Sequence, residues 1–369
     1  MTQLRTVQVL GGGSAGSSAH VRSLAAGLVA RGVRVTVCAP AELGQEYDFP
    51  GAGADFMPVP RRSDPLAVGA LRAACAEAGL VHAHGLNAAV RSAMALPAQR
   101  VPLVVTWHTR AYAQGAARAQ WLRFMERRAV RAAAVVLGTS SELVDRARRR
   151  GARDARLGPV SVPGLPGSRG PGCGAPGDAE EEKARAELGA VDRPLVVSVG
   201  ALEPHRGYGT LLDASRRWLG HDPVPLVAVV GEGQRRAALQ QRIDTEDLPV
   251  RLLGERDDAG VLLAAADLAV LPSRWEARSL VAQEALRRGV PLVATAVGGV
   301  PELVGGAAEL VPYGDAVALA QAVSGLLADP ARRAELAEAG RRQASTWPTE
   351  DDTIAQVLSV YDELCGRGI

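Results

Sequence analysis

Short apolar runs of strand length alternate with segments of helical periodicity from the start of the chain. The run TVQVL (6–10) predicts a buried strand, and the next segment places Val21, Leu24 and Leu28 on one helical face. Gly32 ends that helix. Four more apolar runs predict the strands that follow: VRVTVCAP (33–40), LVHAHG (80–85), LVVTWH (103–108) and AAVVLGTS (133–140). This alternation is typical of a parallel, doubly wound α/β sheet.

A stretch rich in glycine and proline (157–183) interrupts this pattern, and a second series of strands and helices follows it. We therefore predict a first domain over 1–165, a linker over 166–185 and a second domain over 186–349. The second series has six strand-like runs: RPLVVSVG (193–200), VPLVAVVGEG (224–233), VRLLGE (250–255), LAVLPS (268–273), PLVATAVGG (291–299) and AELVPYG (308–314). The chain thus contains two Rossmann-like domains in series.

The composition fits two soluble domains. The chain has 369 residues, 47% of them hydrophobic and only 4% aromatic, so the cores are aliphatic. No apolar run reaches 18 residues, and the first residues have no signal-peptide design. The four cysteines have neither paired nor metal-like spacing. We expect a cytoplasmic protein with reduced thiols.

Charge divides unevenly along the chain. Residues 1–170 contain 22 arginines and 10 acidic residues, a net charge of +12, and residues 171–369 contain 20 basic and 30 acidic residues, a net charge of −10. A basic half favours an anionic acceptor or an anionic membrane surface. The alternative is a set of solvated helix faces in a chain where Lys183 is the single lysine. We expect no nucleic-acid partner.

Gly11, Gly13 and Gly16 follow the first predicted strand with the spacing G-x-G-x-x-G. That spacing is typical of NAD and FAD sites, which also need an acidic residue about 20 positions further on. Here the second strand ends at Pro40, and the first acidic residue after the glycines is Glu42, beyond that proline. Dinucleotide binding is therefore disfavoured. The glycines either bring a phosphate or sugar close to a helix N-terminus or only permit a tight turn.

Two glutamates separated by seven residues mark the second domain. A helix that begins near Ser279 places Glu284 in its second turn and Glu276 in the preceding loop. The amides at that helix N-terminus suit an anionic diphosphate. The two carboxylates suit hydrogen bonds from sugar hydroxyls.

The segment LPSRWEARSLVAQEALRRGVPLVATAVGGVPELV (271–304) resembles the E-x7-E region of family-4 glycosyltransferases, which are retaining enzymes of the GT-B fold. The resemblance extends over nearly the whole chain, including GGGSAGSSAHVRSLAAGLVARGVRVTV (11–37) and VSVGALEPHRGYGTLLDA (197–214). It implies two Rossmann-like domains that face each other across a cleft. The segment TWPTEDDTIAQVLSVYDEL (346–364) resembles the family's helix that crosses back, about 350–369, onto the first domain.

The resemblance also implies roles for individual residues. Glu276, His108 and Arg206 form the catalytic set: Glu276 contacts hydroxyls of the donor sugar, and His108 lies beside the transferred sugar. Glu284 binds the nucleotide ribose. The donor-binding set is Glu284, Ser279, Leu280, Arg278, Gly12, Gly13, Gly233 and Arg251. His82 and His84 are assigned to structure or acceptor contact, and His108 has an alternative role as a capped strand-end histidine.

The chain departs from the family pattern at the phosphate site. The family has G-R-L-x-x-x-K-G, whereas this chain has Gly200-Ala201-Leu202 followed by Arg206-Gly207. Arg206 keeps one cation, and Ala201 removes the other. Arg278, where the family usually has phenylalanine, partly compensates.

The mechanism implied by the resemblance is a same-face displacement that releases a nucleoside diphosphate. The sequence contains no D-x-D motif and no metal-ligand cluster, so we expect metal-independent transfer without a cofactor. The co-substrate is a nucleotide-diphosphate sugar, with UDP favoured over GDP. The acceptor is lipid-linked, a glycan or a small molecule. The alternatives are a catalytically weakened nucleotide-sugar-binding paralogue and a Rossmann oxidoreductase.

The segment ARAQWLRFMERRAVRAA (117–133) combines arginines with Trp121 and Phe124. It predicts either peripheral contact with the inner face of an anionic membrane or a packed helix with its arginines in water.

Overall fold

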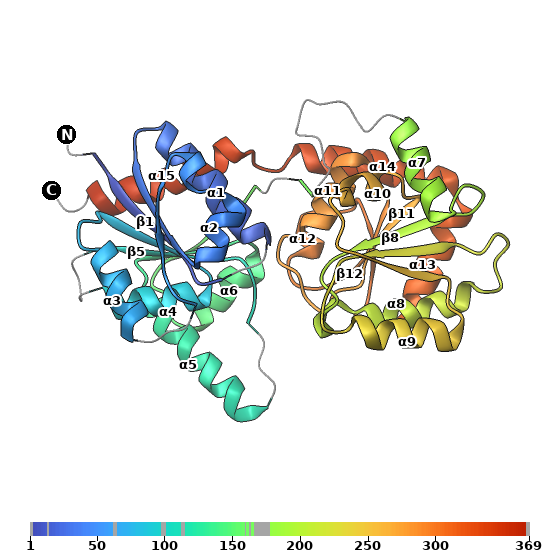
Figure 1. Ribbon diagram of the computed structural model, residues 1–369, viewed down its shortest axis with the longest axis horizontal. Helices are drawn as coiled ribbons and strands as arrows, with labels where there is room; N and C mark the ends of the chain where they lie inside the picture. Colours follow the sequence, from blue (N-terminus) through green and yellow to red (C-terminus); the bar gives the residue numbers. More distant parts are fainter. Residues whose placement is uncertain are drawn as a thin grey trace. The chain divides into compact units, whose positions relative to one another are not determined.

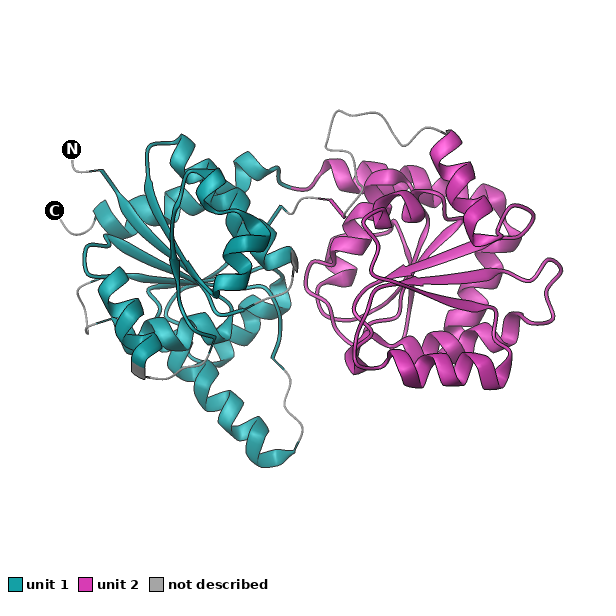
Figure 2. Cartoon of the chain, viewed as in Figure 1, with its two compact units in different colours: residues 1–163, 348–369 teal, residues 164–347 magenta. Residues whose placement is uncertain are grey.

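The computed structural model describes residues 3–12, 15–61, 65–96, 101–111, 115–158, 160–161, 164–165 and 178–366. The chain forms two compact units (Figures 1 and 2). Unit 1 comprises Met1–Pro163 and Pro348–Ile369, and unit 2 comprises Gly164–Trp347. Within the described ranges, no helix is both long and apolar enough to span a bilayer.

Unit 1 is built on a parallel seven-stranded sheet with the order β3-β2-β1-β4-β5-β6-β7. Its strands are β1 (Arg5–Leu10), β2 (Arg34–Ala39), β3 (Asp55–Pro58), β4 (Leu80–His84), β5 (Leu103–Trp107), β6 (Val135–Gly138) and β7 (Ala155–Leu157). The strand order reverses between β1 and β4, and the carboxyl ends of strands at such a reversal are where open α/β sheets bind ligands. Leu10 pairs with His84, and His84 pairs with Thr106, so the ends of β1, β4 and β5 are level.

Helices cover both faces of this sheet (Figure 1). They are α1 (Ala15–Ala30), α2 (Ala41–Tyr47), the 3-10 turn η1 (Pro50–Ala52), α3 (Pro65–Ala74), α4 (Leu86–Ala95), α5 (Ala116–Ala132), α6 (Ser141–Arg149) and α15 (Glu350–Gly366). The predicted apolar face of α1 is confirmed, because Val21, Leu24 and Leu28 are each at most 1% exposed.

Helix α15 follows unit 2 in the sequence but belongs to unit 1. It packs along α1, and Ile354, Val357 and Tyr361 are buried in the core formed with β1 and β2. Ion pairs reinforce the packing: Arg31 binds Asp351 on α15 at 2.9 Å.

Unit 2 is built on a parallel six-stranded sheet with the order β10-β9-β8-β11-β12-β13. Its strands are β8 (Leu195–Val199), β9 (Leu226–Val230), β10 (Val250–Gly254), β11 (Leu268–Leu271), β12 (Leu292–Thr295) and β13 (Glu309–Val311). The helical segments are α7 (Asp178–Leu188), η2 (Pro204–Arg206), α8 (Tyr208–Ser215), η3 (Arg216–Trp218), α9 (Arg236–Glu246), α10 (Ala259–Ala264), α11 (Leu280–Arg288), α12 (Val300–Val304), α13 (Ala316–Ala328) and α14 (Pro330–Ser345). The predicted pair of parallel α/β sheets is confirmed.

The prediction of a linker over 166–185 is wrong in its second part. Residues 178–185 belong to α7, whose composition of alanine and glutamate has high helix propensity. Ala184 and Leu188 are buried in the core of unit 2, and Arg185 donates to the carbonyl oxygen of Ala265 at 2.8 Å. Residues 166–177 lie outside the described part of the chain.

Candidate active site

Loops at the carboxyl ends of β8, β9 and β11 are held together by backbone hydrogen bonds in unit 2. The amide of Leu202 donates to Glu232 O, and the amide of Arg274 donates to His205 O, each at 2.8 Å. Gly207 has φ +74°, and a Cβ at this position would lie 1.9 Å from Pro272 O. Only glycine therefore fits where these two loops meet. The topological switch point of the sheet, between β8 and β11, is thus surrounded by a closely packed set of loops.

Arg206 and Glu276 form an ion pair across this switch point, from η2 and the loop after β11 respectively. Ser273 Oγ donates to Glu276 Oε1 at 2.9 Å, and the two charged side chains are 26% and 14% exposed. Arg206 Nε is buried without a hydrogen-bond partner among the described residues. An unpartnered guanidinium N–H is costly unless a ligand accepts from it, so this atom favours an anion at the site.

The loop that carries Glu276 is fixed from β12 as well. Thr295 Oγ1 donates to Ser273 O at 2.6 Å, and the amide of Gly299 donates to Glu276 O at 2.9 Å. Gly298 has φ +57°, and a Cβ there would lie 2.0 Å from Glu276 O. The backbone of Glu276 is therefore held from two sides.

The predicted helix after Glu276 is α11, with Ser279 as its N-cap residue. Ser279 Oγ accepts from the amide of Ala282 at 3.3 Å. The amides of Leu280 and Val281 are among those that a helix leaves without an intrahelical partner, and they lie at the positive end of its dipole. This terminus has the geometry that an anionic oxygen requires.

Glu284 lies in the second turn of α11, with a side chain that is 6% exposed. Its Oε1 accepts from Arg288 Nε at 2.6 Å. Arg288 thus orients a buried carboxylate group, which is compatible with the predicted role on a ribose.

Arg278 lies elsewhere than the sequence leads us to expect. Its guanidinium stacks on Trp347, 5.8 Å from the ring centroid, and burial lowers its pKa to about 10. Arg287 stacks on the same ring at 5.7 Å. The contacts of Arg278 are therefore with the end of α14, and the structure does not bring it to Arg206 or Glu276. Its Nε and Nη2 have no partner among the described residues.

Gly233 and Arg251 have different surroundings. Gly233 follows β9 and packs against the backbone of Leu202, in the loop set around Arg206. Arg251 lies on the edge strand β10, and its Nη1 donates to Leu188 O at 2.9 Å. That bond anchors α7, so Arg251 has a structural partner and is not brought to the pair of Arg206 and Glu276.

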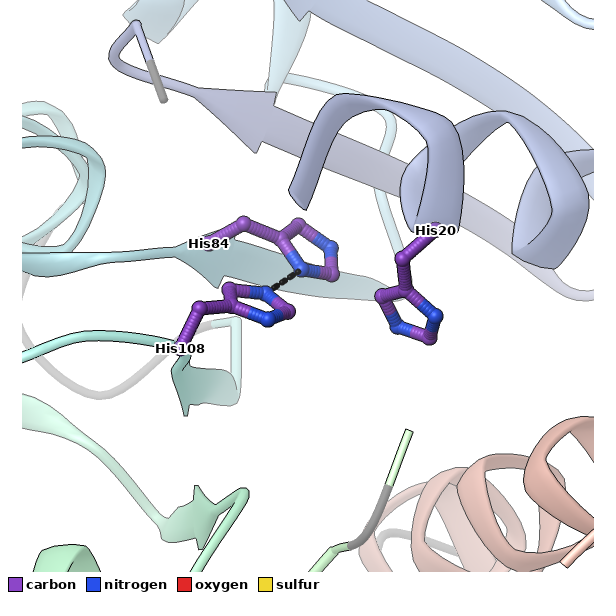
Figure 3. A group of neighbouring side chains, drawn as sticks. All are labelled: His20, His84 and His108. Carbon is purple, nitrogen blue, oxygen red and sulfur yellow. Dashed lines mark hydrogen bonds between the residues drawn. The ribbon is translucent and has the colours of Figure 1, made fainter. Parts of the chain in front are cut away.

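Unit 1 carries histidines where its central strands end (Figure 3). His84 ends β4 and His108 follows β5, and His84 Nδ1 lies 3.2 Å from His108 Nε2. His20, on α1, points toward both, with ring centroids 5.9 and 5.4 Å from those of His84 and His108. His108, a predicted site residue, is thus part of a cluster that sequence reasoning did not anticipate.

A buried network of hydrogen bonds holds the histidine rings in place. His82 Nδ1 lies 2.7 Å from Tyr361 OH, and His82 Nε2 lies 2.7 Å from Thr106 Oγ1. Gln8 connects the two histidines of β4, because its Nε2 donates to Tyr361 OH and its Oε1 lies 3.0 Å from His84 Nε2. The network supports the assignment of His82 to structure.

Burial lowers the pKa of every histidine in this group, because the charged imidazolium loses its water. The pKa of His20 is lowered to about 4 and that of His82 to about 3. Those of His84 and His108 are lowered well below 6.5, with neighbouring histidines adding to the effect of burial. All four rings are therefore neutral at pH 7.

One signal in the sequence points to Gln8, which the sequence analysis missed, and another explains why His82 and His84 act together. Gln8 is a polar residue inside the apolar strand TVQVL, and buried polar residues need partners. His82 and His84 are two residues apart, so they lie on one face of their strand. His20 offers no such signal, because a histidine on a long helix has many possible orientations.

The glycine loop after β1 has a packing role on one side. A Cβ on Gly11 would lie 2.8 Å from Ala88 N, so Gly11 allows α4 to approach β1. Gly12 has φ +87°. Gly13 lies outside the described residues. The close approach of α4 gives Gly11 a packing role that neither interpretation predicted, and the phosphate interpretation for Gly12 and Gly13 stays a prediction.

Comparison with known families matches both units. The model described as "Glycosyl transferases group 1" matches residues 180–343, and the model described as "Glycosyl transferase 4-like domain" matches residues 15–163. The first match spans the strand-end loops of unit 2, and the second spans the histidine cluster.

Individual proteins agree with these matches. A D-inositol 3-phosphate glycosyltransferase of Salinispora tropica is 32% identical over 80% of this chain and 67% of its own. A GDP-mannose-dependent monoacylated alpha-(1-6)-phosphatidylinositol monomannoside mannosyltransferase of Corynebacterium glutamicum is 31% identical over 50% of this chain and 52% of its own. The structure of Anabaena Alr3699/HepE in complex with UDP-glucose superposes with a TM-score of 0.80 at 22% identity, covering 97% of this chain and all of that one.

These similarities cover both sheets and the residues at their strand ends. The structural neighbours have the GT-B arrangement of two parallel-sheet domains. The chain therefore belongs to the glycosyltransferases of the GT-B fold, and the protein is a glycosyltransferase.

Proposed function

We propose that this protein transfers a hexose from a nucleotide-diphosphate sugar to a hydroxyl acceptor, with retention of configuration and without a metal ion. The pair of Arg206 and Glu276 at the switch point of unit 2 is the observation that carries the proposal. A UDP-sugar is the favoured donor, supported by the UDP-glucose complex of the similar Anabaena fold. A GDP-sugar is the second candidate, as in the name of the Corynebacterium relative. The acceptor is a lipid-linked, glycan or small-molecule hydroxyl.

The proposed step exchanges one bond at the anomeric carbon. The bond from that carbon to the β-phosphate oxygen breaks while the acceptor oxygen bonds to the same face of the sugar. The acceptor proton passes to the departing phosphate oxygen. Arg206, whose Nε has no hydrogen-bond partner in the described part of the chain, donates to the developing phosphate charge together with the first amides of α11. Glu276 orients the sugar by accepting from its hydroxyls.

His108 is the catalytic group that we assign to unit 1, as the family resemblance implies. Because burial keeps the pKa of His108 well below 6.5, the ring is neutral at pH 7 and can accept as well as donate a hydrogen bond. Its contact with His84 fixes the orientation of the ring.

A donor panel tests the proposal. The protein is incubated with UDP-glucose, UDP-galactose, UDP-N-acetylglucosamine and GDP-mannose, with and without EDTA. Nucleotide release is followed, and the product anomer is assigned by NMR. We expect UDP release that EDTA does not lower, and a product with the anomeric configuration of the donor. An inverted product contradicts retention, and loss of turnover in EDTA contradicts metal independence.

The second candidate is a nucleotide-sugar-binding paralogue with weakened catalysis, and Ala201 is the observation that favours it. The position is exposed, so an arginine would fit there, and the chain nevertheless lacks this cation. Tight nucleotide binding without release from any donor in the panel supports this candidate over the first.

We also propose that α5 contacts an anionic membrane surface from the cytoplasmic side. Trp121 and Phe124 on this helix are 60% and 54% exposed, and their ring centroids are 6.0 Å apart. Arg123, Arg127 and Arg128 lie on the same helix. Aromatic rings beside arginines are typical of helices that lie in the membrane interface.

A further inference from the structure

His20, His84 and His108 form the one group of three metal-ligating side chains that the described residues contain. One ligand nitrogen from each lies within 4.8 Å of the other two. Three separate elements supply them: α1, the end of β4 and the segment after β5 (Figure 3). His20 and His84 are 2% and 3% exposed, whereas His108 is partly exposed and gives access from solvent.

The hydrogen bonds around His84 leave one of its nitrogens available for a metal. Gln8 Nε2 donates to Tyr361 OH, so Gln8 Oε1 accepts from His84 Nε2 at 3.0 Å. The lone pair of His84 therefore lies on Nδ1, which faces His108. Ligating histidines usually donate their other N–H to an oxygen in this way, which fixes the ring and its tautomer.

His20 has an equivalent second partner. The backbone of Ser161 is a hydrogen-bond partner of the His20 ring. The same ring faces the rings of His84 and His108. Two of the three rings are thus oriented by neighbours that leave a nitrogen directed into the cluster.

The spacing suits a tetrahedral ion. Zinc–nitrogen bonds of about 2.0–2.1 Å place two ligand nitrogens about 3.3 Å apart in a tetrahedron. His84 Nδ1 and His108 Nε2 are already 3.2 Å apart. The third nitrogen must move inward by no more than about 1.5 Å to reach the same geometry. Three imidazoles without a carboxylate select zinc and its transition-metal neighbours over magnesium or calcium.

We propose that His20, His84 and His108 bind one zinc-class transition-metal ion, with a fourth position open to solvent. Binding requires the proton on His108 Nε2 to move to its other ring nitrogen, because Nε2 donates to His84 in the free protein. The ion is then bound by His108 Nε2, the nitrogen that faces the cluster. On the proposed function, in which transfer uses no metal, a bound ion therefore inhibits the reaction.

Cobalt(II) is the probe for this site, because its visible absorption reports the ligands and geometry directly. The full chain, freed of metal with a chelator, is titrated with Co²⁺ and then with Zn²⁺. We expect one Co²⁺ per chain with the absorption of a tetrahedral nitrogen site, and its loss as Zn²⁺ displaces cobalt. No tetrahedral spectrum at stoichiometric Co²⁺ overturns the proposal.

Variants identify the ligands. His20→Gln and His108→Gln should each lower cobalt affinity at least tenfold, whereas His205→Ala and His221→Ala in unit 2 should leave it unchanged. Circular dichroism melts confirm that each variant is folded. Cobalt binding that survives both glutamine variants, or that is lost in either control, overturns the proposal. The spectrum does not depend on sugar transfer, so a failure of the proposed activity is distinguishable from a failure of this site.

Discussion

Unit 1 and unit 2 share a parallel sheet whose strand order reverses beside its first strand, yet they place different chemistry at the strand ends. At the strand ends of unit 2, Arg206 and Glu276 form an ion pair. At the strand ends of unit 1, burial lowers the pKa of His84 and His108, and their rings are neutral at pH 7. A guanidinium suits a diphosphate, and a neutral imidazole suits a hydroxyl group. The same sheet topology thus carries charged groups in one unit and uncharged rings in the other.

The polar groups next to the two strand-end sites are also satisfied differently. In unit 2, Glu284 pairs with Arg288. In unit 1, Gln8 and Tyr361 connect uncharged rings, although Glu126 elsewhere in that unit pairs with Arg146 and Arg150. Folding lowers the pKa of His20 and His82, so the stability of unit 1 depends on pH below 6.5. The predictions below test this contrast.

Acid should unfold unit 1 before unit 2. The pKa of His20 falls to about 4 and that of His82 to about 3 on folding, from 6.5. Below pH 6.5 the unfolded chain binds these protons and the folded chain does not, so stability is lost as pH falls. Each ring lowers the free energy of unfolding by about 1.4 kcal/mol for each pH unit below 6.5. The two rings together lower it by on the order of 5 kcal/mol at pH 4.5.

Peptide mapping after limited proteolysis across pH 7 to about 4, in EDTA, measures this loss for each unit separately. Tyr361 and Thr106 are the polar neighbours of His82. His84 and His108 are the polar side chains next to His20. Protection that disappears from unit 2 first, or from both units at the same pH, contradicts the prediction.

Glu276→Ala should have the largest effect on transfer. Loss of its carboxylate removes the partner of Arg206 and the acceptor for sugar hydroxyls, so we expect kcat/KM to fall about 10²–10³-fold. Glu246→Ala is the control, because Glu246 is also paired with arginines in unit 2 but lies on α9. Unchanged turnover in Glu276→Ala removes this residue from the site.

His108→Ala should lower kcat about 10²-fold, the size of effect typical for a group that positions a proton or a hydroxyl. Donor affinity should change little, because most of the predicted donor-binding groups, including Glu284 and the first amides of α11, lie in unit 2. Nucleotide binding by calorimetry separates the two effects. A large rise in donor Kd with normal kcat would contradict the division of roles between the units.

Ala201→Arg should raise kcat/KM about tenfold, since one added charge-assisted hydrogen bond contributes about 1.5–3 kcal/mol. The exposed position accepts the side chain without displacing its neighbours. Steady-state kinetics with the best donor of the panel is the measurement. Ala201→Gln controls for side-chain size, and an equal gain in both variants argues against a role of charge.

Trp121→Ala should lower binding to anionic liposomes a few-fold without changing transfer to a soluble acceptor. The indole is exposed, so its removal costs membrane contact and little stability. Sedimentation with and without anionic lipid measures the effect. Tyr313→Ala is the matched control, because Tyr313 is an exposed aromatic residue of unit 2. An equal loss of liposome binding in both variants would contradict the proposed membrane contact of α5.

Sequence periodicity predicted all six strands of unit 2 and five of the seven of unit 1, because parallel strands buried on both faces form continuous apolar runs. It missed the edge strands β3 and β7, which are short and only partly buried. It also located the start of α11, since Ser279 precedes an amphipathic helix. It could not predict where long side chains point. Arg278 and Arg251 stand in the predicted segments, yet packing directs one to Trp347 and the other to Leu188.

The histidine cluster shows the same limit. The position of His108 can be predicted because it stands at a strand end. The position of His84 can be predicted from the alternation of residues in β4. His20 joins them only because α1 packs across the sheet at one particular rotation, which depends on contacts far apart in the sequence. Local patterns contain no information about that rotation.

The bond from Tyr361 to Gln8 and His82 has a consequence for how the chain folds as it is made. Residues 1–163 leave the ribosome first, but the hydroxyl that satisfies their buried polar groups arrives about 200 residues later. At about 5–20 residues per second, this is a delay of roughly 10–40 s. Unit 2 is one uninterrupted segment and can finish folding within that interval. Unit 1 is thus synthesised first, but its buried hydrogen bonds are completed only after α15 has been made.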